Sequence, residues 1–508
     1  MDWGGRITYI GETRVKGQNI RFGIKDADRL ATVCLVGRAG SGKAHFLANM
    51  ALQDIARGAG ILVLDGVGNL TQTLLERLPE SARERLVVLD PSDGEHPFSW
   101  NPLDDFHSLP SETAPAFLSE TLASVYQVQN GPVLAFAASA MLSRKEATLL
   151  FLYEAVTDVK ARDRLFPAKS PAREEFESLL AASPDSFSAV TENGRYLAKD
   201  ALMRNLIGQR ASKFTLGTLK EGLPAAQGSM AQAGSIVVVD FSRIRMFPTR
   251  ATPLVRLFLS VARAHASKQA PIPLYMHDCL RYLSQEDLER ALLDRGIALT
   301  VSDTAHGEED SAMRAKLLHH TGSVLTFAPH EADVPFVERV FYPYVAPEEL
   351  EKLEEGQMAV VLAIDSVRSR PFFANALPPA ERTGVSHQDL SLTSRDTYTT
   401  SRLVVDKLFK PKSEEEKDEE KKSDDPGSFS DAFRSIFTKR AAGAPDKNAK
   451  PTAGKPGTAS QKPAEAKTAN APEKEKKTEH TKNEASVKSS EIPEDELRKM
   501  LYAGRLPA

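Results

Sequence analysis

The stretch 31-ATVCLVGRAGSGKAHFLANM-50 decides the fold, because it joins an apolar run, a glycine-rich loop and an amphipathic segment in that order. Gly37, Gly42 and Lys43 satisfy the G-x-x-x-x-G-K pattern of a phosphate-binding loop. The apolar run predicts a strand, and the segment 44-AHFLANMALQDIARG-58 predicts a helix. Since the motif requires strand, loop and helix in this order, the stretch predicts a nucleotide site. A glycine turn without a ligand is the alternative.

The loop amides and the start of the following helix are expected to cradle the phosphates of a nucleotide, with the Lys43 ammonium on the β and γ groups. The predicted cofactor-binding residues are Gly37, Arg38, Ala39, Gly40, Ser41, Gly42, Lys43 and Ala44. The last position normally carries a Ser or Thr hydroxyl that holds magnesium, and Ala44 has none. We therefore expect ATP as a weakly bound cofactor, with the role of magnesium in doubt.

Hydrolysis also requires a strand-end carboxylate for magnesium and a second group that orients the attacking water. The run 271-PIPLYMHDCL-280 ends in His277, Asp278 and Cys279, so it offers no adjacent pair of carboxylates. Asp278 is the single candidate catalytic residue in this run. The histidines have no metal-ligand spacing, and no metal site is predicted.

Short apolar runs that end in a polar residue alternate with helix-like segments, a pattern typical of buried parallel strands in a doubly wound α/β sheet. The runs span 31–37, 59–65, 85–90, 234–240, 271–278, 297–303 and 322–327. They place Asp65, Asp240, Asp278 and Asp303 at strand ends, the edge where such sheets bind ligands. The segment 357-QMAVVLAIDSVRSRPFFANAL-377 predicts a hairpin at the sheet edge.

The chain divides by pattern and composition into five parts. Residues 1–103 and 213–380 are expected to form one P-loop NTPase domain, interrupted by an all-helical domain at 104–212, where the strand-like runs disappear. Residues 381–410 are expected to be a linker. Residues 411–508 carry 20 basic and 19 acidic residues with few large apolar ones, which predicts a disordered charged tail.

Two segments of the tail, 428-SFSDAFRSIF-437 and 492-IPEDELRKMLYAGRLPA-508, have apolar residues at helical spacing. They are either transient helices or short helical motifs that dock on a protein partner. No stretch approaches the roughly 20 apolar residues that span a bilayer, and no signal peptide is recognisable, so a cytoplasmic location is expected. The net charge of −4 neither supports nor excludes DNA as a partner.

Seven segments in order resemble type IV secretion and conjugation coupling proteins of the TraD kind, within the FtsK/HerA group of DNA-pumping P-loop ATPases. They are RFGIKDADRLATVCLVGRAGSGK (21–43), GILVLDGVGNL (60–70), VVLDPSDGEHPFSWNPLD (87–104), LMRNLIGQ (202–209), GSIVVVDFSRIR (234–245), PIPLYMHDCL (271–280) and SRPFFANALP (369–378). The resemblance covers Phe22 to Pro379. It implies a RecA-like fold with an inserted helical domain, a hexameric ring, and ATP-driven DNA translocation.

The chain departs from this family at four positions that carry chemistry. Ala44 replaces the loop hydroxyl, and the segment 65-DGVGN-69 stands where the family has Asp-Pro-His-Gly-Asp. The family's Asp-Glu pair is matched by His277 and Asp278, or by Asp278 and Cys279 in the alternative register, and its sensing Gln is matched by Asp303. Many members also have an N-terminal membrane anchor, whereas here recruitment to a membrane is expected through partners.

Three functions remain open from the sequence. The favoured one is a non-hydrolysing, weakly nucleotide-binding pseudo-ATPase in DNA transfer, which joins an active paralogue in a homo- or hetero-hexameric ring. The alternatives are an active ATP-driven DNA translocase and an interaction scaffold that acts through its tail.

Overall fold

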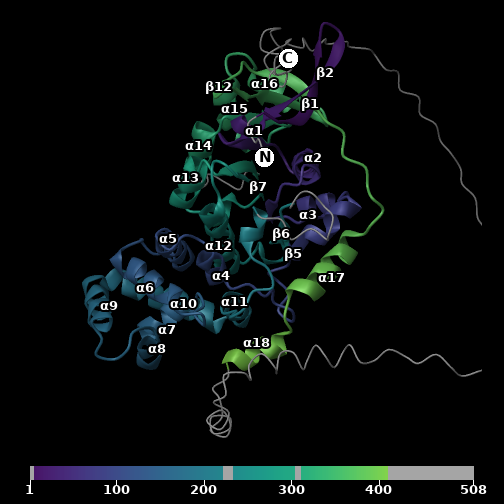
Figure 1. The fold of residues 1–508 in the computed structure, drawn as a ribbon. Coiled ribbons are helices and arrows are strands. Elements are labelled where there is room, and N and C mark those ends of the chain that lie inside the picture. Colours follow the sequence, from purple (N-terminus) through teal and green to yellow (C-terminus); the bar gives the residue numbers. More distant parts are fainter. Residues whose placement is uncertain (1–4, 221–232, 304–310, 410–508) are drawn as a thin grey trace, which may run out of the picture. The chain divides into compact units, whose positions relative to one another are not determined.

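A computed structural model describes residues 5–220, 233–303 and 311–409 (Figure 1). The predicted tail 411–508, with both of its amphipathic segments, lies outside the described residues. No helix among the described residues is long and apolar enough to cross a membrane.

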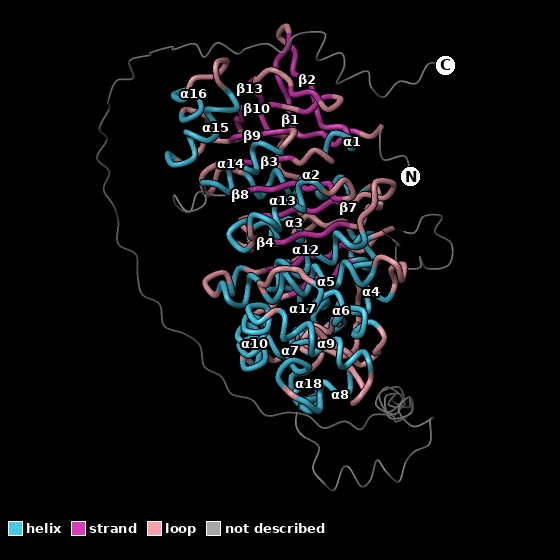
Figure 2. The backbone as a smooth tube through the Cα atoms, turned by 90° about the vertical axis from the view of Figure 1, so that its left-hand side faces the viewer, coloured by secondary structure: helices cyan, strands magenta, loops and turns pink. Residues whose placement is uncertain are grey.

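Seven parallel strands form one side of an 11-stranded sheet, whose strands lie one above another in magenta in Figure 2. In spatial order they are β9 (Ser323–Thr326), β3 (Val33–Val36), β8 (Ile297–Asp303), β7 (Ile272–His277), β4 (Ile61–Asp65), β6 (Ile236–Asp240) and β5 (Leu86–Leu89). Each strand corresponds to one predicted apolar run. Every residue of β4 and of β7 is buried, as expected for strands covered on both faces.

Four antiparallel strands continue the sheet beyond β9. The predicted hairpin exists as β10 (Gln357–Val361) and β13 (Phe372–Ala376), with the short pair β11 (Ala363–Ile364) and β12 (Val367–Arg368) between them. Its predicted position at the sheet edge is wrong, because β1 (Ile7–Val15) pairs with β13 and β2 (Gln18–Lys25) is the outermost strand. The N-terminal hairpin therefore occupies this edge.

Helices cover the sheet. Phe46, Leu47 and Met50 of α2 (Lys43–Ala56) pack against Leu35 of β3 and Tyr275 of β7 in the main apolar cluster, which also includes α3 (Asn69–Leu75). The remaining helices of the sheet domain are α1 (Asp26–Arg29), α12 (Pro248–His265), α13 (Gln285–Leu293), α14 (Ser311–His320), α15 (Val334–Phe341) and α16 (Pro347–Glu351).

The segment between β5 and β6 is helical, as predicted, and contains no strand among its described residues. Its helices are α4 (Pro102–His107), α5 (Ala114–Tyr126), α6 (Pro132–Leu142), α7 (Phe151–Thr157), α8 (Val159–Leu165), α9 (Pro171–Ala182), α10 (Pro184–Lys199) and α11 (Ala201–Ile207). Trp100 stacks on Phe258 of α12 at 4.6 Å, which joins the start of this segment to the sheet domain. The predicted domain bounds 104–212 stay a prediction.

The segment 381–410, expected as a linker, contains two helices. These are α17 (His387–Tyr398) and α18 (Arg402–Phe409), and α17 runs beside β5 (Figure 1). The Ser394 hydroxyl accepts a bond from Val88 N–H at 2.6 Å and donates one to Val88 O at 3.1 Å, so α17 closes this edge of the sheet. Only Leu390 and Ser394 of α17 are buried, which explains why its sequence has the polar character of a linker.

Ser394→Ala is expected to lower the free energy of unfolding by about 1–3 kcal/mol, because it leaves a buried N–H and C=O of β5 without partners. Urea titration followed by far-UV circular dichroism measures the change. Thr397→Ala removes an exposed hydroxyl on the same helix and serves as the matched control. Equal stability of the two variants would contradict the role of Ser394.

Candidate nucleotide-binding site

The predicted phosphate loop joins β3 to α2, so it lies at the carboxyl edge of the parallel strands. Gly42 has φ 98° and precedes α2, whose first N–H groups donate to no capping side chain among the described residues. A Cβ at Gly37 would lie 2.6 Å from Ser41 Oγ and 3.1 Å from Phe327 Cβ, so a larger residue would displace the Ser41 hydroxyl. An uncapped helix start beside a compact glycine loop suits an anion.

The strand on one side of the loop supports it. Arg38 N–H donates to Ala328 O at 2.9 Å, and Phe327 N–H donates to Val36 O at 2.9 Å. The Ser41 hydroxyl is buried, and the part of the chain that the structure describes gives it no hydrogen-bond partner. A buried hydroxyl of this kind fits a phosphate oxygen, while residues 38–40 at the loop tip are exposed.

The Lys43 ammonium lies inside the loop. It donates to Gly37 O and, at 3.0 Å, to Arg38 O, which closes the loop into a ring. Burial lowers the pKa of Lys43, and the nearby Asp278 and Asp303 carboxylates oppose this shift. The loop residues Gly37–Ala44 and the candidate Asp278 are therefore close in space, and their roles stay a prediction.

The oxygen ligands that magnesium prefers are scarce at this site. Ala44 has only a methyl group, which packs against the main apolar cluster. At the end of β7, His277 Nδ1 and Ser302 Oγ are 3.1 Å apart, while the buried Nε2 has no hydrogen-bond partner among the described residues. Neither Ala44 nor the His277 imidazole supplies an oxygen ligand, and the described residues contain no group of three His, Cys, Asp or Glu that could hold a metal ion.

Asp278 is the one carboxylate directly after β7. It is buried with φ 50°, and its N–H donates to Ser302 O at 2.8 Å. A Cβ at Gly66 would lie 2.4 Å from Asp278 O, so the glycine after β4 allows this close approach. Cys279 cannot replace a second carboxylate, because burial raises the pKa of its thiol well above the ordinary value.

Two other strand-end aspartates form hydrogen bonds or ion pairs that stabilise the fold. Asp303 Oδ2 lies 3.5 Å from an Nη atom of Arg314, whose other Nη is 2.6 Å from Asp333 Oδ1. Asp65 accepts from the N–H groups of Val67, Gly68 and Thr71 at 2.7–3.0 Å and thereby holds the start of α3. Both carboxylates thus interact with protein donors, and Asp303 also acts on the charge of Lys43.

Arg314 and Asp333 were not found from the sequence. Both are buried, and both line the same small cavity beside Cys34 and Val36 of the loop strand. The only signal in the sequence is one arginine on a short helix, which has the same appearance as a solvent-exposed arginine.

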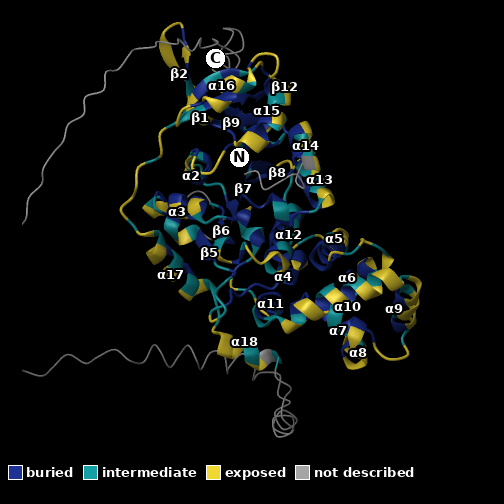
Figure 3. Cartoon of the chain, turned by 180° about the vertical axis from the view of Figure 1, so that it is seen from behind, coloured by how far each residue is buried: buried dark blue, intermediate teal, exposed yellow. Residues whose placement is uncertain are grey.

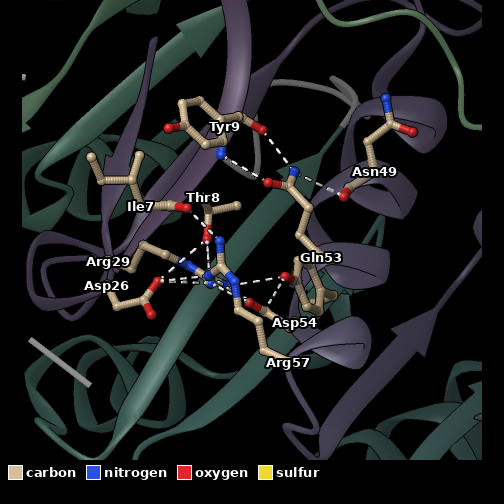
Figure 4. Close-up of polar contacts among 10 residues, drawn as sticks. Ile7, Thr8, Tyr9, Asp26, Arg29, Asn49, Gln53, Asp54 and Arg57 are labelled. Carbon is tan, nitrogen blue, oxygen red and sulfur yellow. Dashed lines mark hydrogen bonds and ion pairs between the residues drawn. The ribbon is translucent and has the colours of Figure 1, made fainter. Parts of the chain in front are cut away.

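The far end of α2 is held by a buried ion network, drawn in Figure 4. Arg29 is fully buried and donates to both carboxylate oxygens of Asp54 at 2.8 Å and to the Tyr275 hydroxyl at 2.9 Å. Arg57 Nη1 lies 3.4 Å from Asp26 Oδ1. Burial has the largest single effect and lowers the pKa of Arg29, but Asp54, Tyr275 and Asp26 together outweigh it, so the pKa is raised. Since Tyr275 precedes His277 by two residues, the network joins α2 to the strand that ends at the site.

Comparison with solved structures identifies the fold of the chain. No protein-family model matches the sequence, and no curated protein matches it. The unbound bacterial conjugative coupling protein TrwBdeltaN70 superposes with a TM-score of 0.50 and 13% identity, over 76% of this chain and 96% of that chain. TrwB in complex with ADP and Mg²⁺ gives 0.45 and 12% over 75% and 92%, and VirB4 of Thermoanaerobacter pseudethanolicus gives 0.41 and 12% over 74% and 97%. The predicted RecA-like P-loop fold and the resemblance to coupling proteins are confirmed at the level of the fold.

Proposed function

We propose that the chain is a coupling-type P-loop protein of type IV secretion that binds ATP weakly and does not hydrolyse it. The proposal rests on a contrast within the site, between a loop that fits phosphates and neighbouring positions that lack oxygen ligands for magnesium. The loop Gly37–Lys43 has the ring, the buried lysine and the uncapped helix start that phosphates need. Position 44 has a methyl group, and the end of β7 has His277, Asp278 and Cys279 in place of the Asp-Glu pair of coupling proteins.

In this proposal the protein contributes binding and assembly to DNA transfer. Lys43, the Ser41 hydroxyl and the first N–H groups of α2 would hold the phosphates. Asp278 and Asp303 both lie near Lys43, but Asp303 also pairs with Arg314, which supports a structural role for these carboxylates at the phosphate end more than turnover. The resemblance to coupling proteins supports a ring with an active paralogue, in which this chain is a regulatory or structural member.

ATP affinity measured with and without magnesium tests the proposal. We expect the dissociation constant of the wild-type chain to change less than about three-fold when magnesium is removed with EDTA, because no protein oxygen at position 44 holds the ion. Ala44→Thr is expected to bind ATP roughly ten-fold tighter in magnesium than in EDTA. Ala44→Val, which has nearly the same shape without the hydroxyl, is the matched control and should behave as the wild type.

Phosphate release in the presence of DNA completes the test. We expect none above the background of the Lys43→Met variant. Release that depends on Lys43 and magnesium would identify an active translocase and overturn the proposal. The absence of any ATP binding would favour the scaffold function.

A further inference from the structure

A cavity of about 220 Å³ lies at the edge of the sheet opposite to the phosphate loop, and Gly60, Gly234 and Pro271 line it. These residues lie at the amino ends of β4, β6 and β7, whereas the loop lies at the carboxyl edge of the parallel strands. Drug-sized ligands occupy cavities of about 300–1,000 Å³. The volume here therefore suits a smaller molecule, at a place separate from the candidate nucleotide site.

Asp26 lines this cavity with a buried carboxylate, whose side chain is 5% exposed. Its Oδ1 accepts from the Thr8 hydroxyl at 3.3 Å and from Arg57 at 3.4 Å. Its Oδ2 accepts no hydrogen bond from the part of the chain that the structure describes, and the dashed lines of Figure 4 reach only one oxygen of Asp26. Burial raises the pKa of this carboxyl, although Arg29 and Arg57 lower it. A buried carboxylate oxygen in this state favours a ligand with a cationic N–H donor.

Arg6 also lines the cavity and supplies a positive charge. Its backbone oxygen accepts from the Asp26 N–H at 2.9 Å, so the two residues are neighbours. Within the described ranges the Arg6 guanidinium forms no hydrogen bond and no ion pair, with Asp26 or with any other residue. Arg57 is less available, because its guanidinium donates to Thr8, to Asp26 and to the Ile7 oxygen. One positive and one negative group thus lie within reach of a single small molecule.

This pair of charges selects against simple ions. A small anion would meet the Asp26 carboxylate and the carbonyl end of α2, while a small cation would meet Arg6 and Arg57. A zwitterion complements both charges, with an ammonium on one side and a carboxylate on the other. Leu219 and Ala270 also line the cavity and would contact a short apolar side chain.

We propose that this cavity binds a small α-amino acid with an apolar side chain. The ammonium donates to Asp26 Oδ2, and the carboxylate accepts from the Arg6 guanidinium. Asp54 and Arg57 also line the cavity, so the bound molecule would lie against the end of α2 that is remote from the phosphate loop. This binding needs no nucleotide, so it is independent of the proposed function.

Titration of the full chain with L-valine, followed by saturation-transfer difference NMR, tests the proposal. We expect a dissociation constant on the order of 0.1–1 mM, as for other ligands of so few atoms. Isobutylamine is valine without its carboxylate, and isovalerate is valine without its ammonium. Each of them should bind at least about ten-fold more weakly than valine, because each leaves one charge of the cavity without a partner.

Three variants locate the binding. Arg6→Gln should weaken valine binding about ten-fold, because it removes the partner of the carboxylate. The matched control is Arg14→Gln, an exposed arginine of the β1–β2 hairpin, whose outer end is yellow in Figure 3. It should bind valine as the wild type does. Lys43→Met should also retain the wild-type affinity for valine, since the phosphate loop lies at the opposite edge of the sheet.

Four results would contradict this assignment. Equal affinity for valine and for either half-molecule would show that the cavity does not recognise a zwitterion. Equal loss in Arg6→Gln and Arg14→Gln, or no loss in either, would mean that valine binds elsewhere. Loss of binding in Lys43→Met would locate valine at the phosphate loop. Absence of saturation transfer to valine, alanine and leucine alike would show that the cavity binds no apolar amino acid.

Discussion

Lys43→Met is expected to weaken ATP binding roughly 10- to 100-fold, the largest effect that we predict for any single change at the site. The ammonium bridges Gly37 O and Arg38 O and so determines both the shape and the charge of the loop. Methionine retains the length of the side chain but removes the charge and its three donors. Isothermal titration calorimetry with ATP in EDTA measures the loss without interference from magnesium.

The control for this prediction is Lys352→Met, which removes an exposed lysine outside the site. Its ATP affinity should equal that of the wild type. Thermal unfolding of both variants should remain close to the wild type, because burial of the Lys43 charge already disfavours the charged form. Unchanged ATP affinity in Lys43→Met would mean that the nucleotide binds elsewhere.

Arg29→Ala is expected to lower the free energy of unfolding by about 3–5 kcal/mol, which is the usual cost of leaving a buried charge without its partner. Asp54 would lose two hydrogen bonds from Arg29 in a site where it is almost fully buried. Urea titration monitored by circular dichroism gives the free energy for the wild type and the variant.

Two variants make this prediction specific. Arg21→Ala also removes an arginine that pairs with an acid, Glu12, but the Arg21 side chain is 67% exposed, so its loss should cost less than about 1 kcal/mol. Combining Arg29→Met with Asp54→Leu removes both buried charges and should recover most of the loss. A double variant as unstable as Arg29→Ala would show that the network contributes more than the cost of an unpaired charge.

The sequence predicted the parallel strands well because each is buried on both faces, so nearly all of its residues are apolar. It did not reveal β1 and β2, whose polar residues alternate with apolar ones and whose sheet partner β13 lies more than 350 residues later. It also did not reveal α17, which contacts the sheet mainly through Ser394, because one hydroxyl leaves no periodic pattern.

The candidate site also has one part that the sequence predicted and one part that it did not. Residues 37–44 were predicted from a contiguous motif, and the structure places them as a compact loop at the start of α2. The ion pairs of Arg314 with Asp303 and Asp333, and of Arg29 with Asp54, join residues from separate elements. No spacing in a single sequence distinguishes such an arginine from one on a solvent-exposed helix face, so these groups are visible only in three dimensions.

The attachment of α2 at both of its ends has a mechanical consequence. Lys43 fixes its first turn to the loop, and Asp54 fixes its last full turn to Arg29 and to Tyr275 of β7. Because both ends of α2 are held, we expect a ligand that enters the loop to stiffen this part of the sheet domain without tilting α2 against β7.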